Sequence, residues 1–217
     1  MRTILTQDHP TIVRDFILNY KLDRPDARII DFTAGKKGFW KTDFKYQLQV
    51  VYCDAEPLPD YPDILKKNLL TDDYTELGMF DAGLFDPPYI IKANKDKRKV
   101  FNYESPASMQ KQGKNSWGTN PQFTENKTSQ VFIERVQGLN RVALQCIKPG
   151  GFLFVKVMDV RDKGWLVPNH LYVCQNLTAF RYYATFVYYA GGAKTWKSHA
   201  ESAHGYWLVF RRLEKKA

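Results

Sequence analysis

Three aspartates stand where short apolar runs of the sequence end: Asp31, Asp54 and Asp86. Asp54 follows Asp31 by 23 residues, close to the roughly 20-residue offset at which an acid at the end of a second strand binds ribose hydroxyls. The glycine turn at 35–38, which is neither a Walker phosphate loop nor Gly-x-Gly-x-x-Gly, lets backbone approach a ligand. Together the turn and the second acid favour an adenosine-containing ligand, although any strand-to-helix connection can contain such a turn.

The tetrapeptide Asp86-Pro87-Pro88-Tyr89 is the most specific motif in the chain. Consecutive prolines cannot donate to a sheet ladder, so the preceding strand must end there. A simple strand stop explains the prolines, but it does not explain why an acid and an aromatic residue bracket them. We therefore expect functional residues at the carboxyl end of this strand.

Strands formed by short apolar runs and helices with apolar residues at helical spacing are predicted to alternate along the chain, and they position these residues. Helices are predicted at 10–20, 129–147 and 169–180, and strands at 28–32, 49–54, 67–70, 80–85, 152–158, 182–189 and 206–210. The last two strands must be antiparallel, because no crossover helix fits between them. The pattern predicts an α/β fold: a mostly parallel seven-stranded sheet with a C-terminal antiparallel hairpin and helices on both faces. Such sheets bind ligands at the carboxyl ends of their strands.

Composition sets limits on the class of protein. With 217 residues, 44% hydrophobic and 15% aromatic, the chain is expected to form one globular domain over 1–217. No apolar run reaches the roughly 18 residues of a membrane span and the start lacks a signal-peptide stretch, so a soluble, cytoplasmic protein with no membrane partner is expected. Three scattered cysteines exclude a disulfide framework, and neither they nor the histidines have metal-ligand spacing, so no metal is expected.

Positive charge is concentrated in one segment. Lys and Arg total 32 against 23 Asp and Glu, a net charge of +9, which suits a polyanionic partner such as nucleic acid. Residues 90–127 carry eight basic and three acidic side chains without a helical or strand period, which predicts a basic insertion or flexible loop. If this loop contacts nucleic acid, the candidate residues are Lys95, Lys97, Arg98 and Lys99 for phosphates and Tyr103 and Trp117 for stacking. A solvated insertion is the alternative.

On these motifs the sequence resembles the class I S-adenosylmethionine-dependent methyltransferases, in particular the Asp-Pro-Pro-Tyr amino-methyltransferases of the DNA adenine-N6 type. The resemblance covers roughly 29–211. It includes the acid and glycine turn, the second-strand acid, the tetrapeptide, Lys148-Pro149-Gly150-Gly151 before the fifth strand, and the final hairpin. It implies a Rossmann-like fold, S-adenosyl-L-methionine as cofactor, and DNA methylation as the activity.

By position, the resemblance implies a cofactor site made of Asp31, Thr33, Ala34, Gly35, Gly38, Asp54, Asn68 and Leu69. The acid and turn after the first strand would face the methionine part, and Asp54 the ribose. Asn68 and its neighbour would face the adenine ring, where the family usually has an acid. Lys37 stands where a small residue is commoner, and we expect it to face water. Lys156, Asp159 and His204 lie near strand ends that could border the pocket, and buried or solvated structural roles are favoured for them.

The resemblance implies a catalytic set of Asp86, Pro87, Pro88 and Tyr89. An exocyclic base amine is a poor nucleophile, so the Asp86 carboxylate and the Pro87 carbonyl would accept hydrogen bonds from it, and Tyr89 would stack on the flipped base. Within this family the leading Asp favours adenine N6 over cytosine N4. The expected partner is nucleic acid, with DNA favoured over RNA. Guanine N2 in RNA is one alternative, and a catalytically weak nucleic-acid-binding module is another. The sequence gives no indication of oligomeric state.

Overall fold

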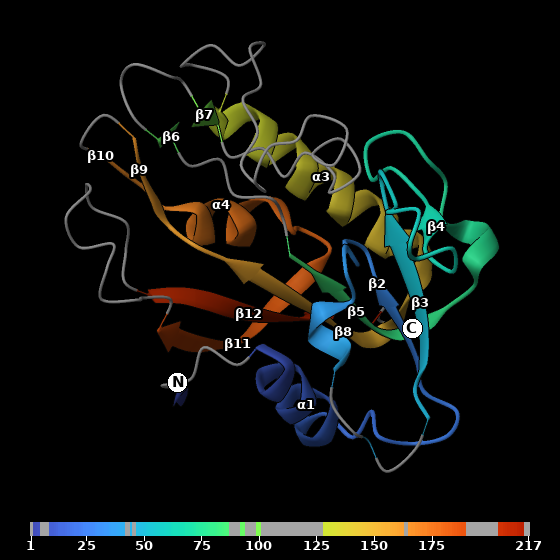
Figure 1. The fold of residues 1–217 in the computed structure, drawn as a ribbon. Coiled ribbons are helices and arrows are strands. Elements are labelled where there is room, and N and C mark those ends of the chain that lie inside the picture. Colours follow the sequence, from blue (N-terminus) through green and yellow to red (C-terminus); the bar gives the residue numbers. More distant parts are fainter. Residues whose placement is uncertain are drawn as a thin grey trace.

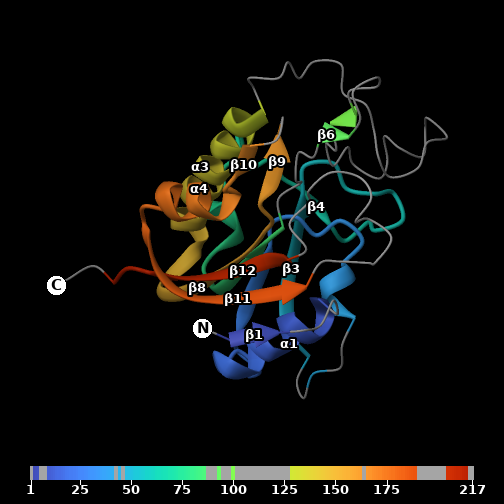
Figure 2. The same cartoon turned by 90° about the vertical axis from the view of Figure 1, so that its left-hand side faces the viewer.

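The computed structural model describes residues 2–4, 9–41, 44, 47–86, 92–93, 99–100, 128–162, 165–189 and 204–214. Within these ranges the chain forms one large sheet, two small two-stranded sheets, and helices α1 (His9–Asn19), α3 (Thr128–Cys146) and α4 (Asn169–Asn176). Figure 1 shows α1 below the large sheet and α3 with α4 above it, and Figure 2 shows the same layers from the side. Helices therefore cover both faces, as predicted.

The large sheet has its strands in the order β1 (Arg2–Ile4), β11 (Phe180–Tyr189), β12 (His204–Arg212), β8 (Ile147–Val157), β5 (Phe80–Phe85), β2 (Arg28–Asp31), β3 (Gln49–Asp54) and β4 (Leu65–Lys66). The five strands from β8 to β4 are parallel neighbours. Strand β12 is antiparallel to both β8 and β11. This confirms the predicted mostly parallel sheet with a C-terminal antiparallel hairpin.

The topology places a ligand-binding edge beside β2. The chain runs outward from β2 through β3 to β4 and then returns to β5 on the other side of β2. Because these strands are parallel, their carboxyl ends lie at one edge, and the order reverses between β2 and β5. This is the kind of switch point at which open α/β sheets bind ligands.

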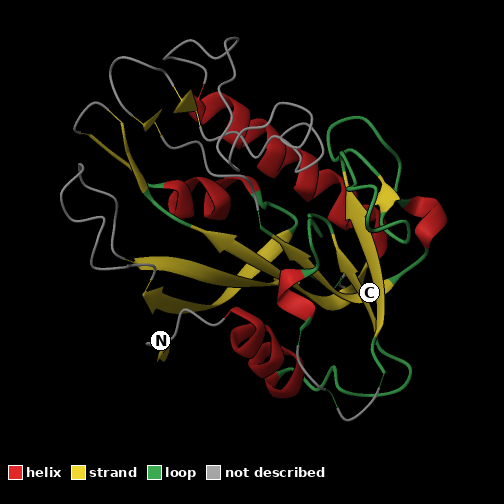
Figure 3. Ribbon diagram, in the orientation of Figure 1, coloured by secondary structure: helices red, strands yellow, loops and turns green. Residues whose placement is uncertain are grey.

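Apolar side chains fill the space between the sheet and each helical layer. On one face, the α1 residues Ile12, Val13, Phe16 and Ile17 are buried, and the Phe16 ring stacks on Phe154 with centroids 4.9 Å apart. On the other face, α3 contributes the buried side chains of Phe132, Val136, Leu139, Val142, Ala143 and Cys146. Figure 3 shows both helical layers separated by the strands. This packing holds the parallel strands rigidly behind their carboxyl ends.

One close approach in the core requires a glycine. A Cβ at Gly83 in β5 would lie 2.7 Å from the Phe32 ring and 3.0 Å from Ile147. The Phe32 backbone N–H also donates to the Leu84 carbonyl oxygen at 2.9 Å. The missing side chain therefore lets the segment after β2 continue along β5 and brings the ends of the two strands together.

The third predicted strand is misplaced. Residues 67–70 were expected to be extended, but β4 is Leu65–Lys66 and the chain then turns. The Asn68 N–H donates to the Asp72 carboxylate at 2.8 Å, and the Asp72 N–H donates to the Asn68 carbonyl at 3.0 Å. These local side-chain bonds compete with a sheet ladder and end the strand.

Other boundaries differ for similar local reasons. The predicted helix at 169–180 ends at Asn176, because Leu177 is buried in the core and the chain turns there into β11. Strand β8 starts at Ile147 rather than 152, with a bulge that contains Gly150 at φ 77°. Strand β1, an eighth strand parallel to β11, was not predicted.

The basic segment 90–127 lies mostly outside the described residues. Within it, β6 (Lys92–Ala93) and β7 (Lys99–Val100) form an antiparallel pair. A second antiparallel pair, β9 (Val160–Asp162) and β10 (Trp165–Val167), follows β8. Among the described helices, none has the length and hydropathy to cross a bilayer.

Candidate functional site

The carboxyl ends of β2, β3, β5 and β8 bring together the polar residues of the candidate site. Asp31 is the last residue of β2, Asp54 is the last residue of β3, and Asp86 directly follows β5. Lys156 lies near the end of β8. The three aspartates that the sequence singled out are therefore neighbours at one edge of the sheet, and they are joined through the turn after β2.

Asp31 is fully buried and is held by two donors. The Thr33 backbone N–H donates to Oδ1 at 3.0 Å, and the Trp40 indole Nε1–H donates to Oδ2 at 2.7 Å. Burial has the largest effect on the pKa of Asp31 and raises it. The hydrogen bonds from Trp40 and Thr33 lower it and the charges of Asp86 and Asp54 raise it, and the net pKa is about 7. The buried carboxyl therefore favours a cationic neighbour, which would stabilise its ionised form.

Thr33 joins the turn after β2 to the end of β5. The Asp86 backbone N–H donates to Thr33 Oγ1 at 2.8 Å. The side chain of Thr33 thus anchors the backbone of the first residue of the Asp-Pro-Pro-Tyr tetrapeptide. The turn expected to contact a cofactor and the strand end expected to contact a substrate are one connected unit.

The same turn is anchored to β3. The Ala34 N–H donates to the Cys53 carbonyl at 2.9 Å, and the Gly35 N–H donates to Asp54 Oδ2 at 3.1 Å. Gly35 has φ 49°, which suits glycine, and a Cβ at Gly38 would meet nothing within 4 Å. The turn therefore presents its backbone to Asp54 at Gly35 and has open space at Gly38.

Asp54 is positioned by backbone donors on both oxygens. Besides the bond from Gly35, the Glu56 N–H donates to Oδ1 at 3.0 Å. A carboxylate offers about four acceptor positions, so these two bonds orient Asp54 and leave capacity for a ligand hydroxyl. This arrangement fits the ribose role that the sequence resemblance implied.

Asn68 and Leu69 are connected to this edge less directly. The Lys67 N–H donates to the Asp54 carbonyl at 2.8 Å, which places the turn containing Asn68 beside β3. The Asn68 side-chain oxygen accepts the Leu70 N–H at 2.9 Å, and the Leu69 carbonyl accepts Arg141 Nη2 at 2.8 Å. These contacts shape the turn, and a contact of either residue with adenine remains a prediction.

Lys37 does not face water as expected. Its ammonium group pairs with the Asp63 carboxylate and lies 4.2 Å from the centroid of the Tyr52 ring. The hydrogen bond from Lys37 lowers the pKa of Asp63. The Lys37 backbone has a left-handed φ of 54°. The hydrogen bond from the Trp40 indole to Asp31 was not predicted either, because no spacing in the sequence links these two residues.

At the end of β5 the Asp86 carboxylate forms an ion pair. Its Oδ2 lies 3.0 Å from Lys156 Nζ. Of the predicted catalytic set only Asp86 is within the described residues, and Pro87, Pro88 and Tyr89 lie outside them, as do Lys95, Lys97, Arg98, Tyr103 and Trp117. For Lys99, in β7, only the backbone is described.

A separate polar cluster beyond the end of β8 has a structural role. Asp159 is buried, accepts the His170 N–H at the start of α4 at 3.1 Å, and lies 2.7 Å from His170 Nδ1. Burial, followed by the charge of Asp159, raises the pKa of Tyr206. Asp159 thus ties β8 and β12 to α4. Within the described ranges, no group of three or more His, Cys, Asp or Glu side chains is arranged to hold a metal ion.

The charge state of Asp31 gives a stability prediction. The pKa of Asp31 is near 7 in the folded protein and about 3.9 in the unfolded chain. Between these two pH values the folded protein keeps a proton on Asp31, and the unfolded chain has released it. Stability should therefore fall as pH rises from about 4 to about 7, by up to about 4 kcal/mol. Thermal unfolding of wild type and Asp31→Asn across pH 4.5–8 measures this, and the variant should lose the downward trend. Equal slopes in both proteins would contradict the assignment.

No protein-family model and no curated protein matches the chain. Solved structures do match. TrmN from Thermus thermophilus has a TM-score of 0.50 at 11% identity, over 94% of this chain and 49% of that one. A possible exported protein from Bordetella parapertussis has a TM-score of 0.51 at 13% identity, over 97% and 69%. The chain spans about half the length of the TrmN structure.

A further match is the N-methyltransferase NodS from Bradyrhizobium japonicum, solved with S-adenosyl-L-homocysteine. It has a TM-score of 0.45 at 10% identity and covers 95% of this chain and 86% of that one. At these identities the likeness to TrmN and to the Bordetella protein shows the fold alone. The chain therefore has the α/β fold of these structures, and its chemistry must be argued from its own residues.

Proposed function

We propose that the protein transfers a methyl group from S-adenosylmethionine to an exocyclic amine of a nucleobase, with adenine N6 in DNA as the target. The hydrogen bond between the Asp86 N–H and Thr33 Oγ1 is the observation that carries this proposal. It joins the turn that fits the methionine part of a cofactor to the carboxylate that fits a substrate amine.

The residues at the ends of β2 and β3 fit S-adenosylmethionine. Asp31 is a buried carboxyl whose raised pKa favours a cationic partner such as the methionine ammonium group. Asp54 is oriented by two backbone donors and has acceptor capacity for ribose hydroxyls. When bound, the cofactor supplies an electrophilic methyl group on a sulfonium centre.

Asp86 supplies the second requirement, which is to make the amine more nucleophilic. The lone pair of an exocyclic base amine is delocalised into the ring, so an acceptor for its N–H groups increases electron density on nitrogen. The Asp86 carboxylate lies 3.0 Å from Lys156 and its side chain is 23% exposed, so it is close to a cation and still reachable. The neighbouring Pro87 carbonyl and the Tyr89 ring complete the proposed base site.

The charge of the chain supports nucleic acid as the substrate. The net charge is +9, and residues 90–127 contribute a five-charge excess directly after the proposed catalytic tetrapeptide. Phosphate contacts by Lys and Arg give affinity without reading sequence.

Parallel assays of methyl transfer test this function. The full chain is given S-adenosylmethionine with a labelled methyl group, together with DNA, RNA or protein, and the digested nucleic acid is analysed by nucleoside mass spectrometry. We expect label in DNA as N6-methyladenine, incorporated about 100-fold or more slowly by the Asp86→Ala variant. Label in guanine N2 of RNA would move the assignment to the alternative substrate. Label in protein alone, or none, would reject the proposal.

A further inference from the structure

We infer that Lys156 is a positioning residue for Asp86: it holds the carboxylate in the orientation that accepts the substrate amine. This inference rests on the proposed function and adds a residue to it. Lys156 Nζ lies 3.0 Å from Asp86 Oδ2, and the two side chains are 12% and 23% exposed. The pair is therefore partly shielded from water. There the two charges attract each other more strongly than on the surface, so the ion pair limits the orientations of the carboxylate more.

The register of the sheet determines this contact. Strands β5 and β8 are parallel, with Phe85 opposite Val155, so Asp86 and Lys156 follow directly on neighbouring strands. On its other side, Lys156 lies opposite Trp207 of β12, which is fully buried. The Lys156 ammonium is also 5.4 Å from the centroid of the Phe39 ring. The lysine thus lies near the Phe39 ring and beside a buried part of β12, and Asp86 supplies the countercharge that a partly buried cation needs.

At least two contacts therefore hold Asp86. Thr33 fixes its backbone N–H at 2.8 Å, and Lys156 fixes one carboxylate oxygen. The second oxygen is then set in a defined direction, and a carboxylate has acceptor positions beyond the one that Lys156 uses. Without the lysine, the carboxyl group can rotate about its Cβ–Cγ bond. A displacement of a reacting group by about 1 Å lowers the reaction rate by up to about 100-fold.

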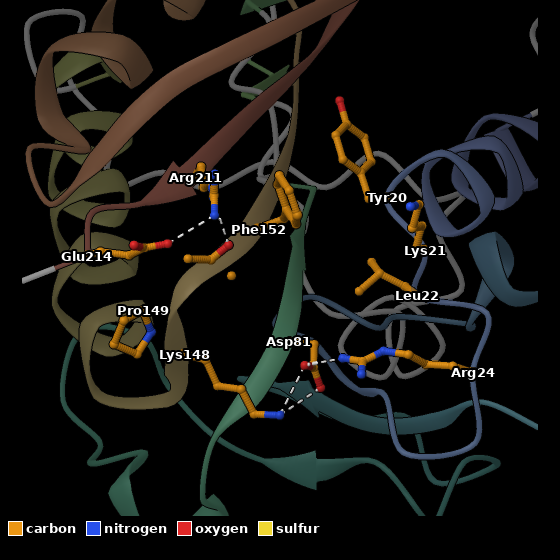
Figure 4. Close-up of a pocket in the computed structure, with 12 residues that line it drawn as sticks. Tyr20, Lys21, Leu22, Arg24, Asp81, Lys148, Pro149, Phe152, Arg211 and Glu214 are labelled. Carbon is orange, nitrogen blue, oxygen red and sulfur yellow. Dashed lines mark hydrogen bonds and ion pairs between the residues drawn. The ribbon is translucent and has the colours of Figure 1, made fainter.

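A second lysine–aspartate pair between the same two strands provides a matched comparison. At the opposite ends of β5 and β8, Lys148 Nζ lies 3.0 Å from both oxygens of Asp81 (Figure 4). Asp81 also accepts Arg24 Nη2 at 2.7 Å and the Arg28 N–H at 2.9 Å. The pair lines a cavity of about 490 Å³ at this other edge. Its acceptors are occupied by structural partners, so it cross-links strands without serving the site of Asp86.

The test compares Lys156→Met with Lys148→Met in the full chain. Turnover on the nucleic acid that the wild type methylates gives kcat and KM, calorimetry gives the Kd for S-adenosylmethionine, and thermal unfolding gives Tm. We expect Lys156→Met to lower kcat by about tenfold or more, with Kd for the cofactor within about twofold of wild type. Lys148→Met should lower Tm by at least as much as Lys156→Met does. It should leave kcat within about twofold of wild type. Lys156→Arg, which keeps the charge, should recover part of kcat.

Any of three kinetic results would overturn the inference: wild-type kcat in Lys156→Met, an equal loss of kcat in Lys148→Met, or no recovery of kcat in Lys156→Arg. The change in Tm caused by Lys156→Met should also differ between the wild type and the Asp86→Asn variant. An equal change in both would overturn the inference, because the two side chains would then be uncoupled. If the wild type transfers no methyl group to any nucleic acid, the proposed function itself fails. That outcome is distinct from an active wild type whose kcat does not depend on Lys156.

Discussion

Replacing Asp86 by alanine should lower the rate of methyl transfer by about 100-fold or more while S-adenosylmethionine binds with an affinity within about twofold of wild type. The expected size follows from the cost of removing one preorganised hydrogen-bonding group from a reacting centre, about 10²–10³ in kcat. Cofactor binding should survive because the bond from Asp86 to Thr33 uses the backbone N–H, which alanine retains. Single-turnover rates and calorimetric affinities measure the two quantities separately.

The Asp86→Ala variant also leaves Lys156 without the carboxylate that lies 3.0 Å away. Loss of one partner of a partly buried pair destabilises the fold, so a lower Tm is expected. The double variant Asp86→Ala/Lys156→Met should recover part of that Tm and none of the turnover. This combination separates a catalytic loss from a folding defect. Wild-type turnover in Asp86→Ala on a verified substrate would refute the proposed mechanism.

The sequence predicted the central strands well because their burial leaves a local signature. Strands β2 and β5 appear as short apolar runs with an acid at or directly after their ends, because parallel strands are covered on both faces. Strand β3 has the same apolar run and final acid, although most of its residues are only partly buried. Strand β4 was misplaced because the turn at Asn68 depends on a hydrogen bond that the Asn68 N–H donates to the Asp72 carboxylate. Strand β1 was missed because three residues pair with β11, more than 180 residues later, and such long-range pairing has no local pattern.

The same distinction applies to the candidate site. Asp31, Asp54 and Asp86 were identified because strand ends of a parallel sheet converge at one edge. The bond from Trp40 to Asp31 depends on how the short 3-10 helix Gly38–Trp40 packs, and the pair of Lys156 and Asp86 depends on strand register over 70 residues. Neither contact follows from residue type and spacing. The sequence therefore predicted the acids of the site and not the side chains that hold them.

Asp54 gives the second large expected effect, on cofactor affinity. Loss of a hydrogen bond to a charged group costs about 1.5–3 kcal/mol, which corresponds to about a 10- to 150-fold weaker Kd. Asp54→Ala removes the proposed ribose acceptor and also the acceptor of the Gly35 N–H at 3.1 Å, so the turn at 33–38 loses one of its anchors to β3. Calorimetric titration with S-adenosylmethionine and with S-adenosylhomocysteine should show the same loss, because both ligands carry the ribose.

Asp73 provides the matched control for this variant. Its carboxylate accepts the Thr75 N–H at 2.9 Å, in the same i to i+2 arrangement as the bond from Glu56 to Asp54 at 3.0 Å. Asp73→Ala therefore removes an equivalent turn-stabilising bond outside the proposed cofactor site, and its Kd should stay within about twofold of wild type. If both variants weaken binding equally, the effect of Asp54 comes from general loosening of turns. If Asp54→Ala binds as tightly as wild type, the acid at the end of β3 does not contact the ribose, and the assignment of Asp54 to the cofactor site is wrong.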